Sequence, residues 1–437
     1  MQMKKLRVLW VSPHCWPDYY LRPGGLGIKS QGGQTVVMYY ATEALTRLYR
    51  SLSIDIYARY ERGEPFEIDL HERTRMIRLL CGTPETYVPK EQFWGAPLEQ
   101  FVNEVDYHAE RNELRYDLIH AHYADGWHTA CELSKRWNVP YICTTHSLGK
   151  RKRANALRTG EATAAELDRK YNFKPRIASE IKALKNATMI CPLTVEEGQY
   201  MVEHYGIDPA KVRVVNNGIV LSQFHPPKPR AAARIRRELG IGPGEYLVSL
   251  FGRVDPRKGQ AQLIEAAPLI RDRVMRATGK KVRFLFLGWS ESEFSRSLVG
   301  RMKKLKVDDG FILHPPVNNR ETPAYYWATD VYALSSTYDI LPIALLEAMG
   351  CGLAVVSTNN GGPSEVITSG KDGILLDPRD ADNLAGAISG LLIDEKLRGR
   401  MGAEALRTIR ERYTWDRLAA RMWRLYREIL TGKGASA

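Results

Sequence analysis

The sequence predicts an α/β protein made of two doubly wound domains, each with a mostly parallel sheet covered by helices on both faces. Three observations predict this fold class. The chain has 437 residues, which is too long for one ordinary core. Short apolar segments rich in β-branched residues alternate with helical patterns along most of the chain. A stretch rich in proline and arginine interrupts the alternation near the middle, and similar alternation follows it.

The first half contains a series of short apolar segments that are typical of buried strands. These segments are 6–13, 52–59, 76–81, 116–123, 140–147, 187–193 and 212–218. Helical patterns lie between most of them, including 34–52 and 166–186. The interruption at 221–239, LSQFHPPKPRAAARIRREL, is typical of a linker that runs into a helix. We therefore expect a first domain over residues 1–225.

The second half repeats the pattern. Expected strands are 246–253, 282–289, 311–316, 331–336, 353–359 and 373–378. The tail, 380–431, is helical in pattern, with an apolar stripe that includes Trp415 and Met422. We expect a second domain over 226–412 and a helix at 413–437 that packs back on the first domain. Ligands in such folds bind beyond the carboxyl ends of the strands, so a cleft between the two domains is the expected site.

Composition restricts the class of protein. Apolar content of 44% and charged content of 26% are typical of a soluble globular chain, and no run of 18 apolar residues predicts a membrane span. The six cysteines have no metal-ligand spacing, so we expect reduced cysteines in a cytoplasmic protein. A net charge of +13 favours anionic partners. No zinc-finger or RRM-type motif supports nucleic acid, while phosphorylated metabolites and anionic lipid stay open.

Two segments of the second half have residues suited to chemistry. In GRVDPRKG, Arg253 and Lys258 follow a strand and precede a helix, where two cations could clamp a diphosphate; an exposed basic turn is the alternative. Between 338 and 367, Asp339 and Glu347 flank an apolar helix that starts near Pro342. Such carboxylates can accept hydrogen bonds from sugar hydroxyls, or they can be ordinary helix caps.

Together these segments resemble the donor side of family 4 retaining glycosyltransferases of GT-B fold, in which two Rossmann-like domains face each other across a cleft. The matching pattern is R-x4-K, then an acid-x7-acid pair, then G-G-P-x-E, here Gly361 to Glu365. The resemblance implies that Arg253 and Lys258 hold the nucleotide diphosphate, that Glu347 binds the ribose and that residue 339 contacts the donor sugar. It also places Ile343 in the donor site. This chain departs from the pattern at Asp339, which is usually glutamate, and at 340–342, where P-F-G is frequent.

The first half resembles sucrose-phosphate synthases and the related mannosylfructose-phosphate and sucrose synthases. The segments that carry this resemblance are GGQTVVMYYATEAL, YVPKEQFWGAPLEQFV, HAHYADGW, THSLGKRK and FKPRIASE, in that order. It implies that His146 faces the transferred sugar and that Gly33 and Gln34 meet both ligands. The remaining acceptor-site residues that it implies are the phosphate-gripping Lys90, Lys152 and Arg176, together with Tyr123 and Asp125.

Three features have competing interpretations. In TTHSLGKRKR, we assign Lys152 to a phosphate site and Lys150, Arg151 and Arg153 to the surface. His120 and His122, two apart on a strand, could form a metal pair, but a structural role is preferred. The pair Asp380 and Asp382 is the one Asp-x-Asp that we note, and it is typical of a helix cap. No metal or other cofactor is therefore expected, and the catalytic set is His146, Arg253, Lys258 and Asp339.

The preferred hypothesis is a metal-independent hexosyltransferase that moves glucose or mannose from a nucleotide sugar to a phosphorylated sugar or polyol. Fructose 6-phosphate is the nearest guess for the acceptor, with inositol phosphate, phosphoglycerate and unphosphorylated fructose as alternatives. A separate phosphatase would then act on the product. A transferase with a lipid-linked acceptor is a second hypothesis, for which the helix at 34–50 is the membrane-binding candidate. An inactive sugar-nucleotide-binding relative is the third.

Overall fold

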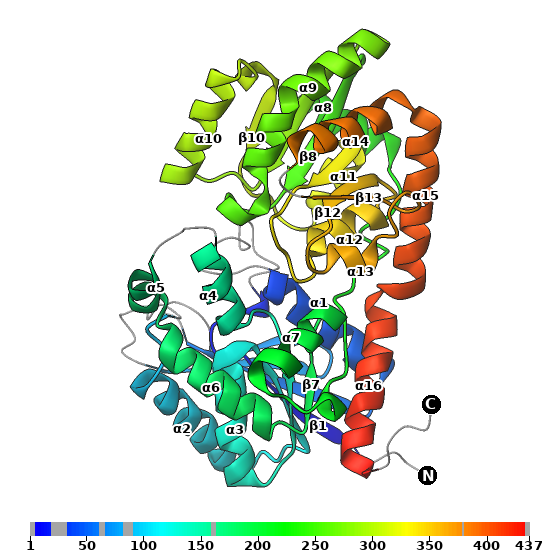
Figure 1. Cartoon of the computed structure of the whole chain (residues 1–437). Helices are drawn as coiled ribbons and strands as arrows, with labels where there is room; N and C mark the ends of the chain where they lie inside the picture. Colours follow the sequence, from blue (N-terminus) through cyan, green and yellow to red (C-terminus); the bar gives the residue numbers. More distant parts are fainter. Residues whose placement is uncertain are drawn as a thin grey trace. The chain divides into compact units, whose positions relative to one another are not determined.

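The computed structural model describes residues 5–18, 33–60, 66–81, 91–158, 163–377 and 380–432 (Figure 1). The chain divides into two compact units. Within the described residues, the first unit contains 5–18, those from 34 to 216, and 416–432, while Gly33 and 217–415 belong to the second. The division at Asn216 and Asn217 lies before the boundary expected at 225, because the segment before the prolines is already bonded within the second unit: Gln223 donates to Asn319, and the His225 carbonyl accepts from the Trp327 indole.

The first unit is built on a seven-stranded sheet with the order β3-β4-β2-β1-β5-β6-β7. All its strand pairs are parallel except β3 with β4. The strands are β1 (Leu6–Val11), β2 (Leu52–Arg59), β3 (Glu67–His71), β4 (Thr74–Leu79), β5 (Leu118–His122), β6 (Tyr141–Thr144) and β7 (Met189–Cys191).

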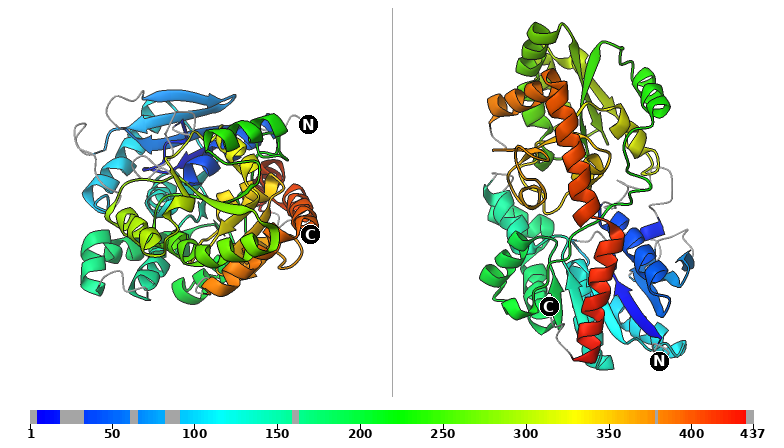
Figure 2. Two further views of the ribbon diagram at one scale, coloured as in Figure 1. Left: turned by 90° about the horizontal axis from the view of Figure 1, so that it is seen from above. Right: turned by 90° about the vertical axis from the view of Figure 1, so that its right-hand side faces the viewer.

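Helices cover both faces of this sheet. The helices are α1 (Gly33–Leu48), α2 (Ala96–Arg111), α3 (Tyr123–Trp137), α4 (Gly149–Arg158), α5 (Ala164–Tyr171), α6 (Phe173–Asn186), α7 (Val195–Tyr205) and α16 (Trp415–Thr431). Apolar residues of α2, α3, α6 and α7 form one core with the sheet. On the other side, Tyr426 of α16 accepts a hydrogen bond from the Trp10 indole of β1 at 3.1 Å, and Figure 2 shows α16 in red running across the strands.

Three local expectations are wrong in detail. Residues 212–218 form no strand: a single bridge joins Val212 to Ile190, because Pro192 has no N–H and ends the ladder on its neighbour β7. The helix expected at 166–186 is two helices, since Asn172 adopts a left-handed conformation with φ 49° between α5 and α6. The helix expected at 34–52 ends at Leu48. The short antiparallel strand β3 was not predicted.

The second unit is built on a six-stranded parallel sheet with the order β10-β9-β8-β11-β12-β13. Its strands are β8 (Glu245–Phe251), β9 (Lys281–Leu287), β10 (Phe311–His314), β11 (Val331–Leu334), β12 (Ala354–Thr358) and β13 (Ile374–Leu376). Its helices are α8 (Pro229–Glu238), α9 (Gln260–Thr278), α10 (Glu293–Lys304), α11 (Thr322–Ala328), α12 (Ile343–Gly350), α13 (Pro363–Val366), α14 (Ala381–Ile393) and α15 (Glu395–Arg412). Helices α9, α10 and α14 share one core with the sheet.

The strand order reverses once in each sheet, and this feature positions the candidate sites. In the second unit the chain moves outward from β8 to β10, then returns and continues on the other side of β8 with β11. In the first unit the same reversal lies between β1 and β5. At such a point neighbouring loops leave the sheet toward opposite faces, which opens a crevice at the carboxyl ends of the two strands. Ligand-binding side chains are therefore expected on the loops after β1, β5, β8 and β11.

Two glycines of α15 test the packing of the second unit. A Cβ on Gly402 would lie 2.1 Å from the backbone oxygen of Gly352, whereas a Cβ on Gly399 in the same helix would meet nothing within 4 Å. We expect Gly402→Ala to lower the unfolding temperature by several degrees, because the helix must move away from the turn before β12. Gly399→Ala should raise stability by up to about 1 kcal/mol through helix propensity. Equal thermal denaturation curves for the two variants would contradict this packing.

Candidate functional site

In the second unit, two loops at the strand reversal are held together by their backbones. Gly259, at the end of the β8 loop, has φ 82°, and a Cβ there would lie 2.1 Å from the backbone oxygen of Ser335 after β11. The Ser335 hydroxyl donates to the Gly259 carbonyl at 2.7 Å, and the Thr337 amide donates to the Arg257 carbonyl at 2.9 Å. The close approach therefore requires glycine at 259.

This contact brings Lys258 and Asp339 together. The Lys258 ammonium and the Asp339 Oδ1 are 2.7 Å apart, although the residues are 81 positions apart in the sequence. Asp339 Oδ2 is buried and has no hydrogen-bond partner among the described residues. Arg253 lies on the same loop and is exposed. Two predicted cations and a predicted acid thus lie at the carboxyl ends of β8 and β11.

The Gly-Gly turn after β12 supports the same acid from the other side. Asp339 forms a backbone bridge with Gly361, and the Gly362 amide donates to the Asp339 carbonyl at 2.9 Å. A Cβ at Gly361 or Gly362 would overlap the backbone of 339–341, at 2.1 Å and 1.8 Å from the nearest carbonyl oxygens. The motif therefore shapes the backbone on which Asp339 is carried.

Glu347, on α12, is a buried acid beside this loop. It is 5% exposed, and the Tyr326 hydroxyl donates to its Oε2 at 2.9 Å. Burial raises the pKa of Glu347 to about 7, although hydrogen bonds from Tyr326 and Asn319 act in the opposite direction. Ile343 is the first residue of the same helix. A carboxylate with so few partners is suited to bind hydroxyl groups of a ligand, which would favour its ionised form.

The raised pKa of Glu347 has a measurable consequence for stability. Between the ordinary carboxyl pKa of 4.5 and about 7, the folded protein keeps a proton on Glu347 that the unfolded chain has lost. The free energy of unfolding therefore decreases as the pH rises through this window. We expect Glu347→Gln to remove that decrease, so that the variant is more stable than the wild-type protein at about pH 8 and similar to it at about pH 5. Thermal unfolding at both pH values measures this; a difference that is independent of pH would contradict it.

In the first unit, the strand reversal brings together His14 and Asp125. His14 follows β1, Asp125 lies in the first turn of α3 after β5, and the His14 Nδ1 and the Asp125 Oδ2 are 2.5 Å apart. Both residues are buried. Gln34, in the first turn of α1, donates to the Ser12 hydroxyl at 2.8 Å at the same edge, and Gly33 precedes it. Gln34 and Asp125 were predicted; His14 was not.

His146 lies one strand further along the edge, just after β6. It is half-buried, and its Nε2 is 3.0 Å from the Nδ1 of His122. Burial is the main cause that lowers the pKa of His146 to about 3. The imidazole is therefore neutral at physiological pH. This placement, at the carboxyl end of a strand near the reversal, is the one expected for a ligand-contacting residue.

Arg176 is part of a buried network that shapes the turn after His146. It is 5% exposed, and its donors bond to Glu180 Oε1 at 2.8 Å, to the Tyr123 hydroxyl at 2.9 Å and to the Ser147 carbonyl at 3.1 Å. The Gly149 amide donates to both oxygens of Glu180, at 3.1 and 3.0 Å. Tyr123 has a left-handed backbone, with φ 67°, which this network holds in place. In this structure Arg176 positions Tyr123 and the 147–149 turn.

The four cations after this turn have different surroundings. Lys150 donates to the His204 carbonyl, Arg151 pairs with Glu196, and Arg153 pairs with Asp168 at 2.8 Å. The Lys152 ammonium lies 4.2 Å from the centre of the Tyr171 ring, a cation–π contact. The assignment of Lys152 to a phosphate site stays a prediction. Lys90, the other predicted phosphate ligand, lies outside the described residues.

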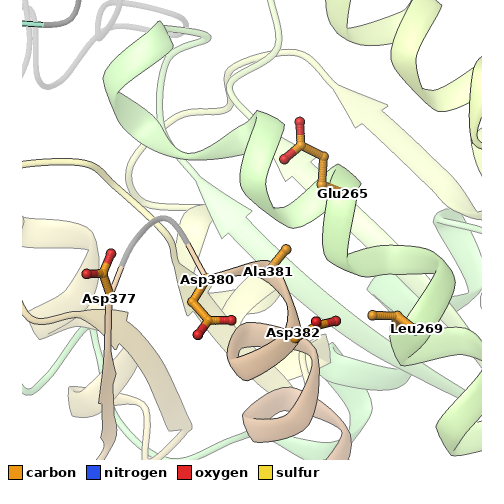
Figure 3. Close-up of a pocket in the computed structure, with 6 residues that line it drawn as sticks. All are labelled: Glu265, Leu269, Asp377, Asp380, Ala381 and Asp382. Carbon is orange, nitrogen blue, oxygen red and sulfur yellow. The ribbon is translucent and has the colours of Figure 1, made fainter.

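The Asp-x-Asp pair lines a pocket of the second unit. Figure 3 shows this pocket, with Glu265 and Leu269 of α9 facing Asp377, Asp380, Ala381 and Asp382. Asp380 accepts a hydrogen bond from the Asn383 amide at 2.9 Å, so its expected role as a helix cap is confirmed. In the described part of the chain, no group of three His, Cys, Asp or Glu side chains could hold a metal ion.

Several residues beside the sites escaped prediction. His14 could have been noticed, because Ser-Pro-His directly follows the first strand, where the chain leaves the sheet edge. Tyr326 and His122 have no local signal for their contacts, because each bonds to a residue on another element. Glu180 pairs with Arg176 four residues earlier on the same helix, but it also accepts hydrogen bonds from Gly149 and Tyr205 on other elements. The six cysteines all lie among the described residues, and they are all unpaired, as predicted.

Membrane interaction through α1 finds no support in the first unit. The apolar residues Val36, Val37, Met38, Ala41 and Leu45 of this helix are buried. Among the described residues, no helix is both long enough and apolar enough to cross a membrane.

Comparison with known proteins covers nearly the whole chain. Residues 31–223 match the family model "Glycosyltransferase Family 4", and residues 232–408 match "Glycosyl transferases group 1". Mannosylfructose-phosphate synthase of Agrobacterium fabrum is 26% identical over 95% of this chain and 90% of its own length. D-inositol 3-phosphate glycosyltransferase of Corynebacterium efficiens is 29% identical over 98% of this chain and 96% of its own length.

Solved structures show the same architecture. Sucrose-phosphate synthase from Thermosynechococcus elongatus has a TM-score of 0.80 at 24% identity, covering 98% of this chain and all of that one. WaaG, a glycosyltransferase involved in lipopolysaccharide biosynthesis, has a TM-score of 0.68 at 16% identity and covers 98% of this chain. With the R-x4-K, acid-x7-acid and G-G-P-x-E motifs on the loops of a Rossmann-like unit, these matches show that the chain belongs to the family 4 glycosyltransferases of GT-B fold.

Proposed function

We propose that the protein transfers glucose or mannose from a nucleotide sugar to a phosphorylated sugar or polyol, with retention of anomeric configuration. The observation that carries the donor half is the group formed by Lys258, Asp339 and exposed Arg253 at the strand reversal of the second unit. Cations at this position are suited to a diphosphate. The names of the relatives support the acceptor half, since they include a mannosylfructose-phosphate synthase and an inositol 3-phosphate glycosyltransferase.

The chemistry follows from where charge develops. As the bond between sugar and nucleotide breaks, negative charge grows on the departing diphosphate. Arg253 and Lys258 would stabilise that charge without a metal ion, because fixed cations act most strongly where charge appears in the transition state. Asp339 would then exchange part of its contact with Lys258 for a hydrogen bond from a sugar hydroxyl, and its Oδ2, which has no hydrogen-bond partner among the described residues, supports this exchange. Glu347 would accept from the ribose hydroxyls.

On the acceptor side, Lys152 and Lys90 would bind the acceptor phosphate, and Arg176 would hold Tyr123 against it. The neutral imidazole of His146 would contact the transferred sugar. The product would keep the acceptor phosphate, so a separate phosphatase would be required to release a free disaccharide. We also propose that the reaction takes place in the cytoplasm, in agreement with the six unpaired cysteines.

A nucleotide-release assay tests the proposal. UDP-, GDP- and ADP-linked glucose and mannose are crossed with fructose, fructose 6-phosphate, inositol 3-phosphate, 3-phosphoglycerate and no acceptor, with EDTA present. We expect release only with a phosphorylated acceptor. Release that depends on added Mg²⁺ would contradict metal independence. Strong release with free fructose would contradict the phosphate site, and tight donor binding without release in any mixture would favour an untested acceptor or an inactive relative.

Lys152 and its neighbour Arg153 form a matched pair for the phosphate site. We expect Lys152→Ala to raise KM for the phosphorylated acceptor about tenfold or more, because one charge-assisted contact is lost, with little change in donor KM. Arg153→Ala should leave both values within about twofold, since Arg153 pairs with Asp168 on the surface. Steady-state kinetics with each substrate varied in turn measures this. Equal effects of the two substitutions would remove Lys152 from the site.

Substitutions of Lys258 and of Asp339 should have different effects on catalysis and nucleotide binding. Lys258→Met should lower kcat by about 10²–10³-fold, because a fixed charge at the leaving group is lost. Asp339→Asn should instead tighten binding of the free nucleoside diphosphate several-fold, because Lys258 no longer has a carboxylate to leave. Calorimetric titration with UDP, GDP and ADP measures the second effect. Arg257→Ala is the control, since Arg257 is exposed and paired with Asp255. Weaker nucleotide binding by Asp339→Asn would refute the exchange.

A further inference from the structure

His122 is a buried histidine for which the donor and acceptor motifs have no role. It ends β5, and its ring is wholly buried. The ring lies 4.3 Å from the ring of Trp10 and 4.5 Å from that of His120, and its Nδ1 is 3.0 Å from the Nε2 of His146. His122 is therefore in direct contact with the residue that we expect to meet the transferred sugar.

The neighbouring network assigns the hydrogens around His120. The Trp10 indole nitrogen can only donate, so the Tyr426 hydroxyl accepts its hydrogen bond at 3.1 Å. We assign the Tyr426 hydrogen to the contact with His120 Nδ1, 2.6 Å away, so that His120 Nε2–H donates to the Thr144 hydroxyl at 2.7 Å. Both nitrogens of His120 are thereby used. The contact of His120 with His122 is one of stacked rings only.

The hydrogen between His122 and His146 can belong to either ring. If it belonged to His146, His122 would carry its own proton on Nε2. That atom is sealed from solvent and has no hydrogen-bond partner among the described residues. A buried N–H without an acceptor is rarer and less favourable than a bare acceptor nitrogen. The proton of His122 therefore lies on Nδ1 and is donated to His146 Nε2.

Neutral rings are required for this assignment, and burial provides them. Burial lowers the pKa of His120 and of His146 to about 3, and that of His122 well below its ordinary value. Each of the three rings then carries one hydrogen at physiological pH. Since His146 Nε2 accepts from His122, the hydrogen of His146 is on its Nδ1.

We propose that His122 is a positioning residue that holds His146 in the Nδ1–H tautomer, so that His146 presents a neutral hydrogen-bond donor to an oxygen of the transferred sugar. The proposal rests on the transferase function proposed above. A neutral donor has an advantage over an imidazolium at this place. The sugar gains positive charge as the leaving group departs, and a charged imidazole nearby would oppose that change.

Two substitutions of His122 separate the effect of its hydrogen-bond donor from the effect of its ring. In His122→Asn the amide nitrogen takes the place of Nδ1 and keeps the donor, whereas His122→Phe keeps a stacked ring without a donor. We expect His122→Phe to lower kcat about tenfold or more with little change in either KM, and His122→Asn to retain most of kcat. Tyr426→Phe is the control, because it alters the network around His120 and leaves the His122–His146 contact in place. It should retain kcat within about twofold.

The tautomer itself is measured by two-dimensional ¹H–¹⁵N NMR of ¹⁵N-histidine-labelled protein, with His146→Gln to assign the signals. We expect His146 to be protonated on Nδ1 in the wild-type protein and to shift toward Nε2–H in His122→Phe. An Nε2–H tautomer of His146 in the wild-type protein would overturn the proposal, and so would a His122→Phe variant with unchanged tautomer and kcat. This measurement needs no substrate. If no donor and acceptor pair gives turnover, the proposed function fails while the tautomer is still decided.

Discussion

The reversal of strand order in each sheet is the constraint on which the candidate sites depend. A parallel sheet needs crossover helices, and where the order reverses the crossovers leave toward opposite faces. The loops between them cannot cover the carboxyl ends of the two central strands, so polar side chains gather there. In the second unit these are Lys258 and Asp339, and in the first unit they are His14 and Asp125. The chain thus uses one backbone arrangement twice, with a lysine–carboxylate pair in one unit and a histidine–carboxylate pair in the other.

Two candidate binding residues of the second unit contain buried polar atoms that are poorly paired. Glu347 is buried with a pKa near 7, and the Oδ2 of Asp339 is buried without a described partner. A core chosen for stability alone would not contain such atoms, because a buried polar group without a partner is costly. The surrounding structure compensates through close backbone contacts, such as that of Gly259 with Ser335, which keep the loops in place before any ligand arrives. A ligand that supplies the missing hydrogen bonds would therefore stabilise the second unit as it binds.

The candidate site of the first unit is organised by packed rings. Aromatic and imidazole rings from β1, β5 and α16 pack face to face or edge to face, from Tyr426 through His120 to His122 and His146. Their burial removes charge from the rings and leaves directed hydrogen bonds as the means of orientation. Beside the 147–149 turn, Arg176 and Glu180 form a buried ion pair. Arg176 also donates to Tyr123, which has a left-handed backbone conformation. The four cations of TTHSLGKRKR consequently have different surroundings. Lys150, Arg151 and Arg153 contact a carbonyl or a carboxylate, and Lys152 lies over the Tyr171 ring.

The sequence by itself determined the two-domain α/β class, most strand positions and the loops that carry Arg253, Lys258, Asp339, Glu347 and His146. These depend on local patterns: β-branched runs, glycine turns and motif spacing. The tertiary structure alone decided which residues meet. His14 and Asp125 are 111 positions apart, and Lys258 and Asp339 are 81 apart, so no local pattern links them. The antiparallel edge strand β3 and the lost strand at 212–218 depend on which neighbour offers free backbone groups. The contacts of Arg176 with Tyr123 and Ser147, and the contact between His122 and His146, arise for the same reason: packing brings groups that are distant in the sequence within hydrogen-bonding distance, and the sequence does not record those distances.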